Sequence, residues 1–300
     1  MKKSSNKNYI VVTGGAGFVG SHLIEVLLNR TNYKIISIDN YSSGSKKNHL
    51  NDTRITYFRG ETLNIEKILR KYKNNIKALF HFGEFSRIYR SFEKFEDCIK
   101  YNIIGTNSVF KFCLNNKIKI IYSATSASIG NKGNDKNLSP YAFTKSKNLE
   151  MLNNLKRWFN LNCEIIFFYN VYGDRQIKSG KMATIIGIFE DCYKKNKPLP
   201  VVKPGTQTRR FTHIIDTVEA CLMAFKKNKS RLYSISHKQK FSILQVAKMF
   251  GQPIKLIPPR KGERFASALT NMHLNKKVYK MFGKLTLKDY VNNFKKINNK

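Results

Sequence analysis

The segment from residue 11 to residue 20 constrains the fold of this chain more than any other part of its sequence. It reads Val-Val-Thr-Gly-Gly-Ala-Gly-Phe-Val-Gly, which places glycines between a β-branched apolar run and an apolar-periodic segment. In a strand-turn-helix unit of this kind, Gly14 permits the tight turn, Gly17 lets the backbone approach a pyrophosphate, and Gly20 allows close packing of helix against strand. The segment therefore predicts a dinucleotide held at a helix N-terminus.

The next predicted strand, residues 34–38, runs directly into Asp39. A carboxylate in this position can accept hydrogen bonds from the hydroxyls of an adenosine ribose, which favours NAD over NADP. Lys46 and Lys47 follow shortly afterwards and could neutralise a 2′-phosphate if their loop folds back. NAD is the expected cofactor, and NADP is the alternative.

The first half of the chain alternates short β-branched runs with amphipathic segments. We expect strands at residues 9–13, 34–39, 78–82, 119–123 and 164–169, and helices at residues 21–29, 65–72, 101–115 and 141–159. This rhythm predicts an α/β fold with a Rossmann-like, doubly wound parallel sheet. Prolines interrupt shorter elements after residue 170. We therefore expect an NAD-binding domain over residues 1–170, with a returning segment near 206–235, and a smaller, mainly substrate-binding C-terminal domain over residues 171–300.

Composition limits the remaining possibilities. A chain of 300 residues with 41% hydrophobic content can form one large α/β domain and a smaller appendage. The five cysteines are odd in number and contain no Cys-x-x-Cys pair, so neither a disulfide framework nor a zinc site is indicated and no metal is expected. The first apolar run is too short for a signal peptide, and charged residues interrupt every hydrophobic stretch. We expect a cytoplasmic protein without membrane insertion.

The net charge of +36 is the most unusual global property. Such a field would attract phosphorylated substrates, nucleic acid or an anionic surface. The lysines are dispersed along the chain beside many asparagines and isoleucines, a distribution typical of solvated faces. Nucleic-acid binding is kept only as a minor alternative.

Tyr141 and Lys145 form the candidate catalytic pair. Their spacing at the start of a predicted helix places both side chains on one face, one turn apart. A neighbouring ammonium and the positive charge of an oxidised nicotinamide favour the phenolate, which brings a proton acceptor with an ordinary pKa near 10 closer to working pH. The spacing alone occurs by chance in many helices; its combination with the upstream glycine turn makes it specific.

Taken together, the motifs resemble the extended short-chain dehydrogenase/reductase superfamily and, within it, the NAD-dependent epimerase/dehydratase family typified by UDP-glucose 4-epimerase. The resemblance covers nearly the whole chain. Its anchors are Thr-Gly-Gly-Ala-Gly-Phe-Val-Gly at 13–20, Asp39-Asn40, His81-Phe82-Gly83, Asn102-Ile103-Ile104-Gly105-Thr106, Ser123-Ala124-Thr125, Ser139-Pro140-Tyr141-x-x-x-Lys145, Tyr169-Asn170-Val171-Tyr172-Gly173, Arg209-Arg210-Phe211 and Arg260-Lys261-Gly262-Glu263.

The resemblance implies a role for each matching residue. Thr125 is the third catalytic residue, with Ser123 or Ser126 as the neighbouring alternatives, and its hydroxyl contacts the sugar. Asn170, Arg209 and Arg260 are expected around the substrate diphosphate, and Glu263 near its ribose. The expected cofactor-binding residues are Gly14, Gly17, Phe18, Val19, Gly20, Asp39, Asn40, Glu61, Phe82, Asn102, Tyr141 and Lys145.

The resemblance also sets the expected reaction. Related dehydratases carry a glutamate two residues after the catalytic threonine, whereas this chain has Ala127, which favours epimerisation over dehydration. We expect an NAD-dependent nucleotide-sugar epimerase, most similar to UDP-glucose 4-epimerase, that oxidises C4 transiently to a 4-keto sugar. The alternatives are another nucleotide-sugar conversion, such as an ADP-heptose 6-epimerase, dehydratase or reductase, and an RNA-binding relative without activity. A homodimer is expected from the resemblance alone.

Overall fold

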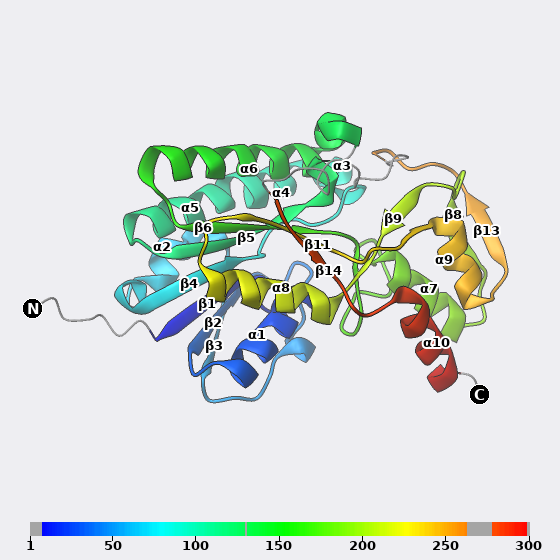
Figure 1. The fold of residues 1–300 in the computed structure, drawn as a ribbon, viewed down its shortest axis with the longest axis horizontal. Helices are drawn as coiled ribbons and strands as arrows, with labels where there is room; N and C mark the ends of the chain where they lie inside the picture. The colour runs from blue at the N-terminus through cyan, green and yellow to red at the C-terminus, as the bar shows by residue number, and fades with distance from the viewer. Residues whose placement is uncertain (1–7, 130, 263–277, 299–300) are drawn as a thin grey trace, which may run out of the picture.

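An eight-stranded sheet runs through the larger part of the molecule (Figure 1). The computed structural model of the chain describes residues 8–129, 131–262 and 278–298. All neighbouring strands in the sheet run parallel, in the order β14-β11-β6-β5-β4-β1-β2-β3. These strands are β1 (Tyr9–Thr13), β2 (Lys34–Asp39), β3 (Ile55–Arg59), β4 (Ile76–His81), β5 (Lys119–Thr125), β6 (Cys163–Phe168), β11 (Leu232–Ser236) and β14 (Val278–Phe282).

The strand order reverses between β1 and β4, because β2 and β3 continue to one side of β1 and β4, β5 and β6 to the other. The connections that follow these two strands therefore diverge and leave a crevice at the carboxyl edge of the sheet, which is where such folds bind ligands. The doubly wound, Rossmann-like sheet expected from the sequence is confirmed.

Helices cover both faces of the sheet (Figure 1). One face packs against α2 (Ile65–Leu69), α5 (Thr106–Asn115) and α6 (Pro140–Phe159), and the other against α1 (Phe18–Arg30) and α8 (Ile214–Lys227). Each face has its own buried core, since the side chains of a central parallel strand alternate between two covered surfaces. Two short helices, α3 (Arg90–Glu93) and α4 (Phe95–Ile99), follow the loop after β4.

A smaller lobe lies beyond the carboxyl edge of the sheet, at the right of Figure 1. Three two-stranded sheets and three helices form it around a third apolar core. Its elements are β7 (Val171–Tyr172), β8 (Leu199–Val202), β9 (Thr208–Arg210), β10 (Thr212–His213), β12 (Lys240–Ser242), β13 (Ile254–Ile257), α7 (Ile185–Lys194), α9 (Ile243–Phe250) and α10 (Leu287–Asn298).

The observed elements differ from the expected ones in a few places. Strand β3 was not predicted, because its sequence, Ile-Thr-Tyr-Phe-Arg, is short and only partly buried. The helix expected over residues 101–115 begins at Thr106, after a π-helical segment at Lys100–Gly105. The main sheet takes its last strand, β14, from far beyond the returning segment expected near 206–235.

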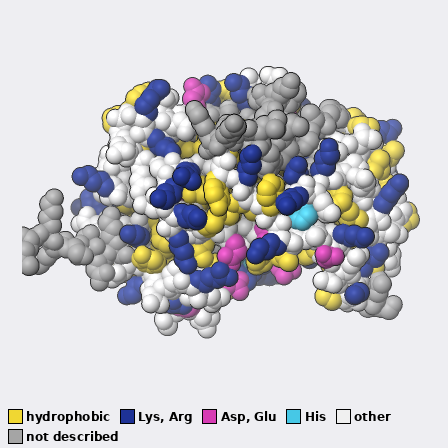
Figure 2. Space-filling model, viewed as in Figure 1, with side chains coloured by type: hydrophobic (Ala, Val, Ile, Leu, Met, Phe, Trp, Pro, Cys, Tyr) yellow, Lys and Arg dark blue, Asp and Glu magenta, His cyan; other side chains and the backbone are white. Residues whose placement is uncertain are grey.

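The five cysteines are free, and all except the half-buried Cys192 are buried, as expected of reduced thiols. None of the helices within the described part of the chain combines the length and the apolar character needed to cross a membrane. Lysine and arginine side chains are scattered over the face shown in Figure 2, with a few acidic side chains among them. This distribution fits solvated faces better than a continuous basic stripe.

Candidate functional site

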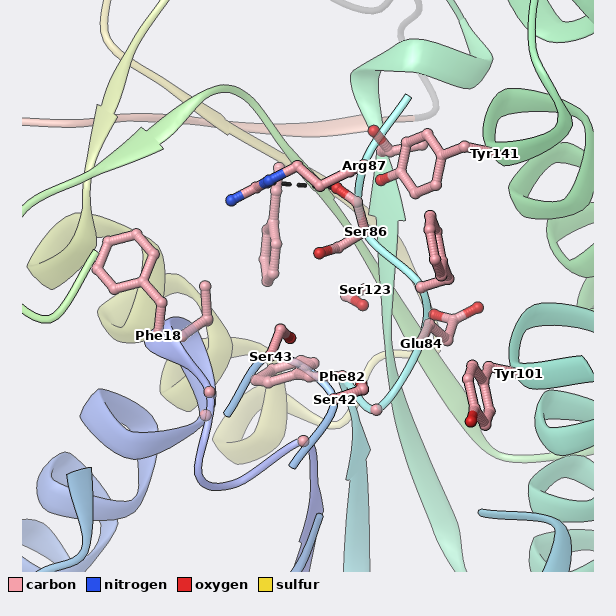
Figure 3. A pocket seen from close by; sticks show the side chains of 18 of the residues that line it. Phe18, Ser42, Ser43, Phe82, Glu84, Ser86, Arg87, Tyr101, Ser123 and Tyr141 are labelled. Carbon is pink, nitrogen blue, oxygen red and sulfur yellow. Dashed lines mark hydrogen bonds between the residues drawn. The ribbon is translucent and has the colours of Figure 1, made fainter. Parts of the chain in front are cut away.

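A cavity of about 410 Å³ opens at the carboxyl edge of the main sheet, where the strand order reverses (Figure 3). The glycine turn lines one side of it, and the loops after β4 and β5, together with the start of α6, line the other. The cavity thus brings together segments that are far apart in the sequence. Of the residues expected to bind the cofactor, those on its wall are Gly14, Gly17, Phe18, Val19, Gly20, Asp39, Asn40, Glu61, Phe82, Tyr141 and Lys145.

The glycine turn leaves no room for larger side chains. Gly14 has a φ of +70°, and a Cβ atom on it would lie 2.8 Å from the backbone of Phe82. A Cβ atom on Gly20 would lie 2.1 Å from the carbonyl oxygen of Gly14. The turn leads into α1, whose free N–H groups and positive dipole end face the cavity wall. Such a cradle fits the pyrophosphate of a dinucleotide.

Asp39 lies beside this turn at the end of β2 and is nearly buried. Its Oδ2 accepts a hydrogen bond from the backbone N–H of Ala16 (3.0 Å), and its Oδ1 accepts one from the N–H of Tyr41 (2.8 Å). Burial raises the pKa of Asp39, and these backbone donors oppose that shift. Both oxygens keep further lone pairs for ribose hydroxyls, so the carboxylate suits the ribose of NAD.

Glu61 also lines this cavity. Its Oε1 lies 2.9 Å from Lys100 Nζ and 3.3 Å from the hydroxyl of Tyr101. The carboxylate is thus held in place by a lysine and a tyrosine from the π-helical segment. Asn40 and Phe82 are further lining residues.

Asn102 lies outside the cavity wall, although it was expected to bind the cofactor. Its side chain is fully buried; its Oδ1 accepts a hydrogen bond from the N–H of Phe85 (2.6 Å), and its Nδ2 donates to Thr144 Oγ1 (3.0 Å). The amide therefore fixes the loop after β4 against α6. A buried asparagine and a ligand-binding asparagine look alike in the sequence, because both are polar residues in an apolar-periodic segment.

Thr125, Tyr141 and Lys145 line the same cavity. Thr125 ends β5, and its Oγ1 accepts a hydrogen bond from the N–H of Ala127 (3.2 Å), which leaves its own hydrogen available to a ligand. Ser139 caps the N-terminus of α6 and Pro140 occupies its first turn. Tyr141 and Lys145 consequently project from the first turns of a well-defined helix.

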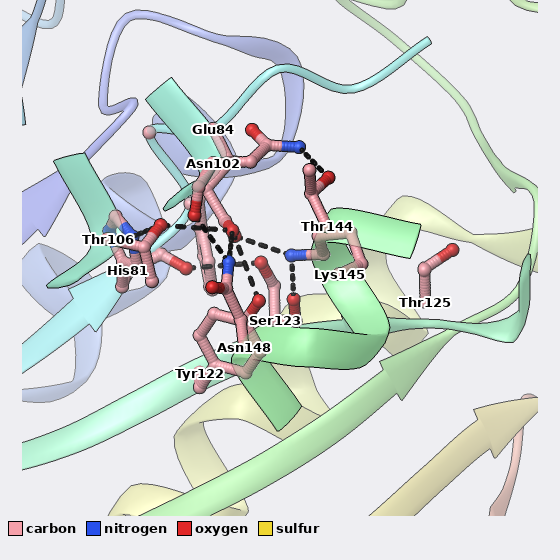
Figure 4. Close-up of polar contacts among 12 residues, drawn as sticks. His81, Glu84, Asn102, Thr106, Tyr122, Ser123, Thr125, Thr144, Lys145 and Asn148 are labelled. Carbon is pink, nitrogen blue, oxygen red and sulfur yellow. Dashed lines mark hydrogen bonds and ion pairs between the residues drawn. The ribbon is translucent and has the colours of Figure 1, made fainter. Parts of the chain in front are cut away.

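Lys145 has a partner that the sequence did not reveal. Its Nζ lies 2.5 Å from Oε2 of Glu84, and both side chains are only 4% exposed. The same ammonium donates a hydrogen bond to the carbonyl oxygen of Ser123. Burial lowers the pKa of Lys145, and Glu84 opposes that shift. Figure 4 shows these groups converging at the end of β5.

A second cavity, of about 710 Å³, adjoins the first on the side of the smaller lobe. Arg209 and Arg260 line it, and Asn170 lines both cavities. The Asn170 side chain donates a hydrogen bond to the carbonyl oxygen of Arg210 (2.8 Å), and the guanidinium of Arg260 lies 5.9 Å from the ring centroid of Tyr89. Glu263, expected near the substrate ribose, lies outside the described residues.

Arg87 is a further residue that sequence reasoning missed. It lines both cavities, and its Nε donates a hydrogen bond to the carbonyl oxygen of Met182 (2.7 Å). Burial lowers the pKa of the guanidinium, while Tyr141 raises it. Figure 3 shows the side chains of Arg87 and Tyr141 near each other in the first cavity. The sequence contains 55 lysines and arginines, and nothing around Arg87 distinguishes it as a residue that lines a cavity.

Comparison with known proteins identifies the family. The model of the NAD dependent epimerase/dehydratase family matches residues 10–236. The chain belongs to this family. NAD, the cofactor expected from Asp39, is the cofactor that this family uses. Proteins similar to this chain carry names that specify different nucleotide-sugar substrates.

Two relatives and one solved structure illustrate the similarity. The chain is 29% identical over 261 residues to the ADP-L-glycero-D-manno-heptose-6-epimerase of Brachyspira hyodysenteriae, covering 82% of this chain and 81% of that protein. It is 31% identical over 227 residues to a putative UDP-glucose 4-epimerase of Methanocaldococcus jannaschii, covering 72% of each. The fold matches that of Thermus thermophilus UDP-glucose 4-epimerase in complex with NAD, with a TM-score of 0.79, 21% identity and coverage of 96% of this chain and 99% of that chain.

Proposed function

We propose that this chain is an NAD-dependent nucleotide-sugar epimerase that inverts C4 of a UDP-hexose through a transient 4-keto sugar. The observation that carries the proposal is the meeting of Thr125, Tyr141 and Lys145 on a cavity that also contains the glycine turn and Asp39. This shared lining supports a cofactor and a proton acceptor that act on one substrate. A relative named as a putative UDP-glucose 4-epimerase supports the choice of substrate.

In this mechanism Tyr141 is the proton acceptor. Its phenolate removes the proton of the sugar 4-hydroxyl, and Lys145 stabilises the phenolate by its positive charge. The hydroxyl of Thr125 donates a hydrogen bond to the sugar oxygen while the proton leaves. When bound, NAD would supply the group that takes up the hydride of C4 and gives it back. Rotation of the 4-keto sugar in the cavity presents the opposite face of C4, so that hydride regained by the carbon and a proton regained by its oxygen from Tyr141 invert C4 without net oxidation.

In the proposal, residues of the two cavities would hold the cofactor and the substrate. The turn at Gly14, Gly17 and Gly20 would hold the pyrophosphate, and Asp39 the adenosine ribose. The second cavity would hold the rest of the substrate, with Arg209 and Arg260 at its diphosphate. Guanidinium groups suit this task because their planar donors match phosphate oxygens in pairs.

Ala127 supports epimerisation over dehydration. This residue lines the cofactor cavity, where the related dehydratases are expected to carry a glutamate that removes a second proton. A methyl group cannot perform that step. The second candidate is epimerisation at C6 of an ADP-heptose, which one relative catalyses according to its name. The segment 178–183, before α7, resembles the stretch in which such enzymes carry a second basic residue, and its two lysines form ion pairs with Glu190 and Glu93.

Homodimerisation is part of the proposal. Large apolar side chains are exposed on α6, including Phe143 (42%), Met151 (39%) and Trp158 (56%), and on the neighbouring segments, including Phe95 (54%) and Ile104 (51%). Exposed apolar surface of this extent on adjacent helices favours burial against a second copy. Light scattering of the purified protein would measure the mass directly.

The proposal is tested by incubating NAD-loaded protein with UDP-glucose, UDP-N-acetylglucosamine and ADP-heptose in separate reactions. Proton NMR of the products identifies the inverted carbon. Inversion at C4 of a UDP-sugar is the expected result. Inversion at C6 of ADP-heptose alone would replace the proposal by the second candidate, and absence of turnover of all three sugars would contradict both.

A further inference from the structure

Glu84 lines the cofactor cavity, and polar side chains from several elements surround its carboxylate (Figure 4). It lies in the loop that follows β4, and its side chain is 4% exposed. Its Oε1 accepts hydrogen bonds from Thr106 Oγ1 (3.2 Å), the hydroxyl of Tyr122 (3.1 Å) and Asn148 Nδ2 (3.1 Å). Its Oε2 accepts a hydrogen bond from the ammonium of Lys145. Nothing in the proposed mechanism uses this buried carboxylate.

A directed chain of hydrogen bonds connects Glu84 to the strand before the glycine turn. Thr13 Oγ1 accepts hydrogen bonds from the N–H groups of Phe82 and Gly83, so it donates its single hydrogen to His81 Nδ1 (2.7 Å). His81 is then protonated at Nε2 and donates to Thr106 Oγ1 (2.9 Å), which donates to Glu84. The same hydrogen of Thr106 also lies within reach of the carbonyl oxygen of Tyr101 (3.4 Å), which is the longer of its two contacts. The chain therefore calls for an acceptor oxygen at position 84, and the ammonium of Lys145 makes a carboxylate the acceptor that balances its charge.

Lys145 is confined by the same groups. An ammonium has three hydrogens to donate. One points to Glu84 and one to the carbonyl oxygen of Ser123, while the centroid of the Tyr122 ring lies 4.4 Å from Nζ. A single donor direction is left for the cavity that Lys145 and Tyr141 share.

The pair of Glu84 and Lys145 also determines the charge beside Tyr141. The other titratable groups that face the pair are His81 on β4, Cys98 on α4 and Tyr122 on β5, and Tyr141 itself lies on α6. Burial lowers the pKa of His81 to about 4, raises that of Cys98 to about 11 and raises that of Tyr122. These three groups are neutral near pH 7. Within the described residues around the pair, Glu84 thus offsets the positive charge of Lys145.

We propose that Glu84 is a positioning residue that fixes the Lys145 ammonium with one donor toward the cavity and offsets its charge next to Tyr141. The inference rests on the proposed roles of Tyr141 and Lys145 in sugar oxidation. Removing the negative charge of Glu84 lowers the pKa of both neighbouring groups. Tyr141 and Lys145 then each lose a proton more readily. Both limbs of a pH profile that needs ionised Tyr141 and protonated Lys145 move to lower pH.

The test variant is Glu84→Gln in the NAD-loaded enzyme. It retains the side-chain volume and removes the charge. We expect both limbs of the kcat profile to move down by about one pH unit or more, and kcat at the wild-type optimum to fall at least tenfold, while KM changes little. Glu84→Asp keeps the charge and should leave the limbs near their wild-type positions. A Glu84→Gln profile with unshifted limbs would overturn the proposal.

A second readout does not depend on any sugar substrate. Ultraviolet absorbance of tyrosinate, taken as the difference from Tyr141→Phe, gives the titration of Tyr141 in the NAD-loaded protein. It should occur at lower pH in Glu84→Gln than in the wild type, and an unchanged titration would overturn the inference. If no nucleotide sugar is converted, the proposed function fails, whereas this titration still decides the role of Glu84.

Glu164→Gln is the matched control. Glu164 forms an equally buried ion pair with Lys119 (3.3 Å, side chains 0% and 8% exposed) at the opposite end of strands β5 and β6. Loss of this carboxylate is expected to lower the melting temperature without moving either limb of the pH profile. Shifted limbs in Glu164→Gln as well would attribute the effect to general destabilisation and contradict the specific role of Glu84.

Discussion

The carboxylate of Asp39 is joined to the glycine turn by a hydrogen bond of 3.0 Å from the backbone N–H of Ala16. The group proposed to hold the adenosine ribose and the turn proposed to hold the pyrophosphate are therefore one structural unit. A change in either part is expected to alter the binding of the whole dinucleotide.

Asp39→Asn is expected to weaken NAD binding by about 10- to 100-fold, because a charge-assisted hydrogen bond contributes about 1.5–3 kcal/mol. Burial raises the pKa of Asp39, so NAD affinity should fall with decreasing pH through a range above the ordinary titration of an aspartate. Isothermal titration calorimetry between pH 4 and pH 8 measures both effects. Glu66→Gln, an exposed carboxylate on α2, is the control and should bind NAD like the wild type.

Gly20→Ala is expected to destabilise the protein by about 1–3 kcal/mol, because the new methyl group would overlap the carbonyl oxygen of Gly14. Gly17→Ala is a milder change, since its Cβ would lie 3.1 Å from the same oxygen. That variant should fold normally and lose NAD affinity through the loss of close backbone approach. Thermal unfolding with and without NAD separates the two effects. Equal melting temperatures for Gly20→Ala and wild type would contradict this description of the turn.

Tyr141→Phe is expected to lower kcat by about 10²- to 10⁴-fold, because it removes the proton acceptor. NAD affinity should change little, since the ring remains. Steady-state kinetics together with NAD titration measure the two quantities. Tyr279→Phe on β14, away from both cavities, is the matched control and should retain wild-type kinetics. A Tyr141→Phe enzyme with normal kcat would refute the assignment.

Arg209→Gln is expected to raise KM for the nucleotide sugar by about 10- to 100-fold, because a paired guanidinium-phosphate interaction is lost. NAD affinity should remain unchanged, as Arg209 lines the second cavity and not the first. Arg157→Gln, at the exposed end of α6, is the control. If Arg209→Gln binds UDP as tightly as the wild type, the second cavity does not hold the diphosphate.

Five strands of the eight-stranded main sheet could be predicted because their signals are local. The glycine turn, the apolar runs of β1, β2, β4, β5 and β6, and the N-terminal cap of α6 are each set by a few adjacent residues. The pair Tyr141 and Lys145 could be found because it lies within one helical turn. Strand β14 could not be assigned to the sheet, since its only neighbour in the described sheet, β11, lies far from it in the sequence.

The residues missed in the site depend on tertiary contacts. Glu84 looks like an ordinary acidic loop residue, and only the folded chain brings it to Lys145, far along the sequence. Arg87 likewise acquires its position from the junction of two cavities. Asn102 was predicted to bind the cofactor because of its place in a motif. In the structure its side-chain amide instead holds the loop after β4.

The central claim is that C4 of the sugar is oxidised and then reduced at the same carbon. Incubation of the NAD-loaded enzyme with UDP-glucose deuterated at C4, followed by NMR of the product, tests it most directly. Transient C4 oxidation predicts UDP-galactose with the deuterium retained at C4. Deuterium at C6 of a 4-keto-6-deoxy sugar would identify a dehydratase and contradict the proposal, as would loss of the deuterium to solvent.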